Sequence, residues 1–165
     1  AGARFQVIGM GDPAAAEKVA RALQILGTES AFVVYSEDGM DELSPEGISH
    51  IWQVDPERVR RRRTRPADFG LPEGSRSDLT AVAAEDSVRL INGVLDGRGA
   101  GQNHPPGVDL SARSVVVMNA AAALVAAGRA ASFQEGADLA AESIDSGEAR
   151  AKLQALAALS NRLAP

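Results

Sequence analysis

The sequence predicts an α/β fold: a partly parallel sheet with a hairpin edge, covered by alanine-rich helices. Residues 5–10 and 32–35 are short apolar segments separated by a helical pattern, as in two parallel strands joined by a crossover helix. Residues 48–54 and 59–65 flank an Asp-Pro-Glu turn, which favours an antiparallel hairpin. From about residue 78 onward the pattern is helical and rich in alanine, which predicts the layer that covers the sheet.

The first helix is expected over residues 14–26. Asp12 is a good N-cap, Pro13 suits the first helical position, and Gly27 ends the pattern. The stretch GMGDP at residues 9–13 also follows a strand and opens a helix, as a phosphate-binding loop does. It lacks the third glycine of GxGxxG and the lysine of a P-loop, so the helix-capping interpretation is favoured.

The remaining chain predicts four helices. They are expected over residues 77–95, 110–127, 132–145 and 148–162, with a loop at 101–106. Their many small side chains indicate helices that pack closely on one another or on a sheet face.

The composition narrows the class of protein. A chain of 165 residues is about one domain long and can bury a core. It has no cysteine, which excludes a disulfide framework and a thiolate metal site. A net charge of −5 argues against a surface that generally binds nucleic acid. There is no apolar run of the roughly 20 residues that span a bilayer and no signal-peptide pattern, so we expect a soluble, cytoplasmic protein.

The stretch SEDGMDELSP, residues 36–45, places the carboxylates of Glu37, Asp38, Asp41 and Glu42 directly after an apolar strand. In an open parallel sheet, ligands bind beyond the carboxyl ends of the strands. The adjacent Asp41 and Glu42 could therefore hold magnesium, with waters and the phosphates of a ligand completing the coordination. The alternative from the residues alone is a solvated acidic loop, or a cap on a following helical turn.

A second candidate is a run of six arginines within residues 58–65: Arg58, Arg60, Arg61, Arg62, Arg63 and Arg65. Such a run is typical of a nucleic-acid or anion patch. In an extended segment, however, alternate side chains point to opposite faces, and charged residues protect an edge strand from pairing. We favour the edge-strand interpretation, because no aromatic residue is interleaved to stack on bases.

The two histidines, His50 on a strand and His104 in a Pro-rich loop, have no partner at metal-ligand spacing. A structural or solvent-facing role is favoured for both. The chain has no GxSxG motif, so nucleophilic hydrolysis has no support.

Several segments, in this order, resemble the carboxyl-terminal half of the anthranilate phosphoribosyltransferase family: QVIGMGDP, EDGMDELSPEG, RPADFGLP, VVVMNAAAALVAAG and EGADLAAESIDSGEARAKLQAL. The resemblance implies a catalytic domain like that of nucleoside phosphorylases and phosphoribosyltransferases. It implies transfer of phosphoribosyl from phosphoribosyl pyrophosphate to anthranilate, with Mg²⁺, in tryptophan biosynthesis by a homodimer. It also places the family's metal-binding pair on Asp41 and Glu42. Glu37 and Asp38 are then expected to be solvent-facing loop residues without a role.

The resemblance also shows what this sequence does not contain. The family's glycine-rich GTGGD loop, its KHGNR segment, its anthranilate-binding arginine and its helical dimerisation domain have no counterpart in these residues. We therefore expect residues 1–165 to be the carboxyl-terminal portion of a phosphoribosyltransferase α/β domain. We assign it no catalytic acid or base and no substrate-binding residue, and we expect it to be inactive alone.

Two alternatives remain on the same fold. A relative without the biosynthetic activity could bind nucleic acid through Arg58–Arg65, and the unusually basic run is the feature that suggests it. A nucleoside phosphorylase is less favoured, because the DEL turn matches the transferase better.

Overall fold

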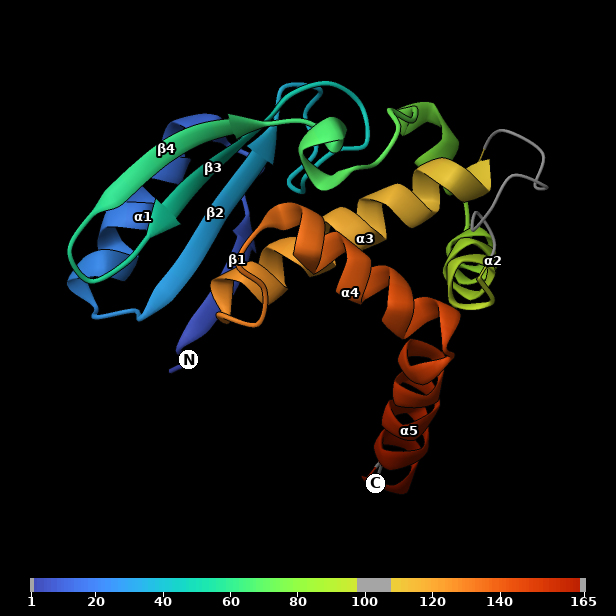
Figure 1. Ribbon diagram of the computed structural model, residues 1–165. Coiled ribbons are helices and arrows are strands. Elements are labelled where there is room, and N and C mark those ends of the chain that lie inside the picture. Colours follow the sequence, from blue (N-terminus) through green and yellow to red (C-terminus); the bar gives the residue numbers. More distant parts are fainter. Residues whose placement is uncertain (1, 98–107, 164–165) are drawn as a thin grey trace.

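The computed structural model describes residues 2–97 and 108–163 (Figure 1). It has a mixed four-stranded sheet in the order β1-β2-β3-β4. β1 (Phe5–Gly9) is parallel to β2 (Ser30–Ser36). β3 (Ser49–Val54) pairs antiparallel with β2, and β4 (Val59–Thr64) pairs antiparallel with β3. The predicted α/β class, the parallel pair and the hairpin edge are confirmed.

The helix α1 (Pro13–Ile25) connects the two parallel strands. The Asp12 carboxylate accepts a hydrogen bond from the Ala14 amide at 2.9 Å, and Pro13 occupies the first turn. The predicted cap at GMGDP is thus confirmed, because a carboxylate here satisfies an amide that has no partner within the helix.

Strand β2 is buried on both faces, which explains its unbroken apolar sequence. Ala31 and Val33 pack with α1 in one apolar cluster. Phe32 and Val34 belong to a second cluster, which includes residues of α3 (Val108–Ala126) and α4 (Phe133–Asp145). Figure 1 shows the result, with α1 on one side of the sheet and α3 and α4 on the other. Alternation of side chains along a strand separates the two clusters.

The helical layer matches the prediction except at one helix. α3, α4 and α5 (Glu148–Leu163) begin and end close to the expected positions. The helix expected over 77–95 is wrong at its start: residues 76–79 form a separate 3₁₀ turn and α2 spans Ala84–Leu95. The Asp86 carboxylate accepts from the amides of Val82 and Ala83, which fixes the start of α2 there. The expected loop at 101–106, with His104, lies outside the described residues.

Small residues let α3 and α4 approach closely, as predicted. A Cβ atom on Gly136 of α4 would lie 2.9 Å from the Ala121 carbonyl oxygen of α3, so the contact requires glycine. α5 contacts α4 and then leads away from the rest of the fold (Figure 1). Among the helices described in residues 2–97 and 108–163, none has the length and apolar character needed to cross a membrane.

Candidate functional site

The acidic turn lies where the two parallel strands end. It follows Ser36, the last residue of β2, and it also meets the end of β1. A Cβ atom built on Gly9, the last residue of β1, would lie only 1.7 Å from the carbonyl oxygen of Asp41. The turn is therefore at the carboxyl edge of the parallel pair, as the sequence predicts, and its backbone rests directly on β1.

Three buried serines hold the backbone of the turn. The Ser36 hydroxyl donates to the Glu42 carbonyl oxygen at 2.6 Å. The Ser44 amide donates to the hydroxyl oxygens of Ser36 and Ser49, each at 3.0 Å. Because the Ser36 proton is used on Glu42, the Ser49 hydroxyl must be the donor in the 2.6 Å contact between the two serines. The sequence reasoning did not identify these serines.

Asn119 ties the turn to the helical layer. Its side-chain oxygen accepts from the Leu43 amide at 3.0 Å, and its side-chain nitrogen donates to the Leu43 carbonyl at 3.0 Å. The same nitrogen donates to the Val115 carbonyl within α3 at 2.9 Å. The sequence contains a signal for this residue that we did not use: Asn119 is a polar residue in the otherwise apolar stretch VVVMNAAAAL.

The expectation that Glu37 and Asp38 lack a role is wrong. The Asp38 carboxylate accepts from the Met40 amide at 3.1 Å and from the Ser44 hydroxyl at 2.5 Å. The Glu37 carboxylate, although about half exposed, binds His50 and Arg63. Both residues are structural, since their oxygens bind groups of the turn and of the neighbouring strands.

Asp41 and Glu42 differ from their neighbours. Both are exposed, and neither side chain forms a hydrogen bond or ion pair with the residues that the structure describes. Although Glu42 is exposed to solvent, neighbouring atoms remove part of its hydration; this desolvation, and then the nearby Asp41 carboxylate, raise the pKa of Glu42 above its ordinary value. A cation bound between the two carboxylates would relieve this repulsion.

The donor set fits magnesium only in part. Within residues 2–97 and 108–163 there is no group of three or more His, Cys, Asp or Glu side chains that could hold a metal. Magnesium is commonly held by one or two carboxylates, with waters and substrate phosphates as the other ligands. Asp41 and Glu42 are oxygen ligands of this kind, so the pair fits a shared site in which a phosphorylated ligand contributes.

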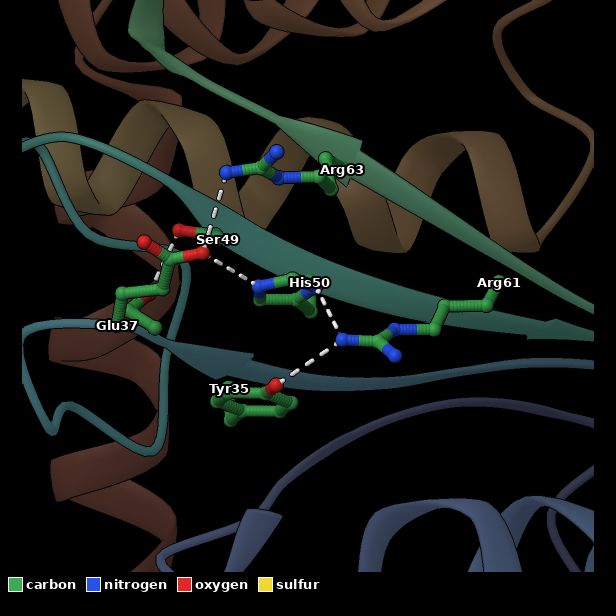
Figure 2. A network of polar contacts seen from close by, with 7 residues as sticks. Tyr35, Glu37, Ser49, His50, Arg61 and Arg63 are labelled. Atoms are coloured by element: carbon green, nitrogen blue, oxygen red, sulfur yellow. Dashed lines mark hydrogen bonds and ion pairs between the residues drawn. The ribbon is translucent and has the colours of Figure 1, made fainter.

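Figure 2 shows that His50 is the centre of a polar network rather than an isolated residue. Arg61 donates to His50 Nδ1 at 3.0 Å, and His50 Nε2 lies 2.9 Å from a Glu37 oxygen. An arginine can only donate, so Nδ1 carries no proton and Nε2 donates to Glu37. The His50 ring is buried and stacks on Tyr35 with ring centroids 4.7 Å apart. The structural role favoured for His50 is confirmed.

The arginine run forms the edge strand of the described sheet, as predicted, and its side chains go to both faces. Arg61 lies over the Trp52 ring, and Arg63 pairs with Glu37 at 3.3 Å. Arg62 lies over the Phe133 ring, which belongs to the opposite apolar cluster. The run therefore does not present one continuous basic stripe.

The Glu37 network predicts a dependence of stability on pH. The hydrogen bond from His50, and to a smaller extent Arg63, lowers the pKa of Glu37 below its ordinary value of 4.5. The carboxylate of Glu37 therefore takes up a proton more readily in the unfolded chain than in the native state. Its contribution to the free energy of unfolding is fully present above about pH 4.5 and is lost as the pH falls through the lowered pKa. Glu37→Gln should reduce the loss of stability on acidification, measured as the urea midpoint over a series of pH values.

Glu57→Gln is the matched control for this measurement. Glu57 is exposed in the turn between β3 and β4, at the end of these strands that lies away from His50. The substitution therefore removes the same charge as Glu37→Gln without affecting a contact of His50. Equal acid sensitivity of Glu37→Gln and the wild type would contradict the assigned role of the network.

A family model described as "Glycosyl transferase family, a/b domain" matches residues 1–150. The chain belongs to this family. Among curated relatives, the anthranilate phosphoribosyltransferase of Moorella thermoacetica is 42% identical over 159 residues, which cover 96% of this chain and 44% of that protein. The enzyme of the same name from Thermomicrobium roseum is 41% identical, with 98% and 44% covered. The chain thus spans less than half the length of these relatives.

Solved structures of the family have the same fold. Anthranilate phosphoribosyltransferase from Saccharomyces cerevisiae, in complex with PRPP and Mg, matches with a TM-score of 0.74 and 28% identity, over 91% of this chain and 41% of that one. The enzyme from Thermus thermophilus matches with a TM-score of 0.74 and 28% identity, over 88% and 40%. These matches confirm the family and the fold that the quoted motifs indicate.

Proposed function

We propose that this chain is part of an anthranilate phosphoribosyltransferase, which transfers phosphoribosyl from phosphoribosyl pyrophosphate to anthranilate in tryptophan biosynthesis. The curated relatives bear that name, and the yeast structures contain PRPP with Mg, or 4-fluoroanthranilate. The observation in this chain that carries the proposal is the Asp41–Glu42 pair. Two exposed carboxylates without a cationic partner among the described residues lie at the carboxyl edge of the parallel strands.

In this proposal Asp41 and Glu42 hold Mg²⁺ together with the pyrophosphate of the donor. Magnesium bound there would neutralise charge on the departing pyrophosphate. The residues of this chain contribute by position. Ser36 and Asn119 bind the backbone of the turn, so the main chain from which the two carboxylates extend is held in place. We propose no general acid or base from the described residues.

The same proposal includes the domain, the oligomeric state and the location of the complete protein. Residues 1–165 form a portion of the family's α/β domain, which the match over residues 1–150 supports. The complete protein acts as a homodimer, and it acts in the cytoplasm. The support for these two statements is the resemblance to the family.

Nucleic-acid binding through Arg58–Arg65 is not proposed, because no finding beyond the arginine run itself favours it. The side chains of Arg61, Arg62 and Arg63 contact Trp52, Phe133 and Glu37 within the fold.

The proposal is tested with the complete protein that contains this chain. With phosphoribosyl pyrophosphate, anthranilate and Mg²⁺, we expect the fluorescence of anthranilate to fall as phosphoribosyl anthranilate forms, and chelation of Mg²⁺ to stop the reaction. No product from the complete protein would contradict the proposed function. We expect the isolated chain of 165 residues to form no product, because its sequence has no GTGGD loop for the pyrophosphate. Turnover by the isolated chain would contradict this second expectation.

A further inference from the structure

We propose that Asn119 is a positioning residue of the magnesium site, which acts by fixing the backbone that carries Asp41 and Glu42. The inference rests on the proposed function, because it concerns the same pair of carboxylates. Asn119 itself has no contact with either carboxylate among its hydrogen bonds. Its effect is transmitted through Leu43, the residue that directly follows the pair.

Two successive peptide groups after the carboxylates are held by side chains. In the first, the Glu42 carbonyl accepts from Ser36 and the Leu43 amide donates to Asn119. In the second, the Leu43 carbonyl accepts from Asn119 and the Ser44 amide donates to Ser36 and Ser49. Each peptide plane is thus bound on both of its polar groups, so rotation about it would break a hydrogen bond.

Asn119 is suited to this task by its amide. The oxygen faces the Leu43 N–H, and the nitrogen uses its two protons on the carbonyls of Leu43 and Val115. The amide therefore has a single orientation that satisfies all three contacts. Leu43 is fully buried, so the loss of Asn119 would leave its backbone groups without an easy replacement from water.

The contact also connects the acidic turn to the helical layer. Asn119 lies on α3, and the side chain of Leu43 packs in the same apolar cluster as Val117, Met118 and Ala122 of that helix. On its other side, the turn rests on Gly9 of β1 through the Asp41 carbonyl. The backbone between Asp41 and Leu43 is consequently held between the sheet and α3.

The test uses Asn119→Asp and Asn119→Leu in the complete protein. Both are close to asparagine in size, and both lack the NH₂ donor to the Leu43 carbonyl. We expect the Mg²⁺ concentration for half-maximal activity to rise about 10-fold in both, with most of kcat recovered at saturating Mg²⁺. We also expect faster hydrogen exchange of the Leu43 amide, a readout that does not need activity. Should Asn119→Leu fail to fold, Asn119→Asp carries the test.

Asp145→Asn is the control for a general loss of stability. It weakens the 2.8 Å ion pair between Asp145 of α4 and the buried Arg113 of α3, which is a different contact of the same helix. We expect this variant to be less stable than the wild type but to keep the wild-type Mg²⁺ dependence.

The outcomes separate the inference from the proposed function. Wild-type Mg²⁺ dependence in the Asn119 variants, or the same shift in Asp145→Asn, would overturn the inference. If neutralising Asp41 and Glu42 also left the Mg²⁺ dependence unchanged, the assignment of these two carboxylates to the metal site would fail, and the inference with it. The proposed function fails separately, if the complete wild-type protein forms no phosphoribosyl anthranilate. The hydrogen exchange of Leu43 reports on the Asn119 contact in either case.

Discussion

Replacing Asp41 by Asn together with Glu42 by Gln should reduce kcat/KM for phosphoribosyl pyrophosphate by about 100-fold or more in the complete protein. The two amides keep the size of the side chains but remove both negative charges from the proposed ligands. Raising the Mg²⁺ concentration should restore little of the rate, because the amide oxygens bind the ion weakly. The measurement is the initial rate over a matrix of Mg²⁺ and phosphoribosyl pyrophosphate concentrations.

The same double variant should be at least as stable as the wild type when Mg²⁺ is absent. Partial desolvation and then the Asp41 carboxylate raise the pKa of Glu42, so the native state binds this proton more readily than the unfolded chain. The charged carboxylate therefore lowers stability as the pH rises from the ordinary value of 4.5 through the raised pKa. Removing the charge abolishes this penalty at neutral pH, which thermal unfolding in the presence of a chelator would measure.

Glu57→Gln is a suitable control for the charge change, since Glu57 is exposed in the β3–β4 turn away from the site. It should leave both the rate and the Mg²⁺ dependence unchanged. Wild-type kinetics in the double variant would exclude Asp41 and Glu42 as the metal-binding pair. A marked loss of stability without Mg²⁺ would show that the two carboxylates have structural contacts.

Gly9→Ala should be strongly destabilising, by about 3 kcal/mol in the free energy of unfolding. The added methyl group would lie 1.7 Å from the Asp41 carbonyl oxygen, a backbone atom that cannot rotate away. Either β1 or the acidic turn must shift, and a shift of the turn moves Asp41 itself. We therefore expect weaker use of Mg²⁺ in addition to the loss of stability, measured by urea unfolding and by Mg²⁺ titration of the activity.

Gly11→Ala is the matched control, in the same GMGDP stretch. A Cβ atom at Gly11 would have nothing within 4 Å, so this change should be close to neutral. If Gly9→Ala and Gly11→Ala behaved alike, the contact between β1 and the turn would not matter.

Residues whose partners are near in the sequence were predicted well. Asp12 and Pro13 mark the start of α1 because a cap is a contact over two residues, between Asp12 and the Ala14 amide. The hairpin of β3 and β4 follows from a local turn. The start of α2 was missed because the Asp86 carboxylate competes for the amides of Val82 and Ala83, which periodicity does not reveal.

The sequence by itself determined the order of the elements, the edge strand whose arginines alternate between the two sheet faces, and the position of Asp41 and Glu42. These features depend on local contacts and on motifs. Only the tertiary structure decided how the pair is held. Asn119 and Leu43 are 76 residues apart, and Glu37 and His50 are 13 apart. Gly9 meets Asp41 across the end of the sheet. Such contacts depend on how α3, β1 and the turn pack in space, and no local pattern encodes the distance between them.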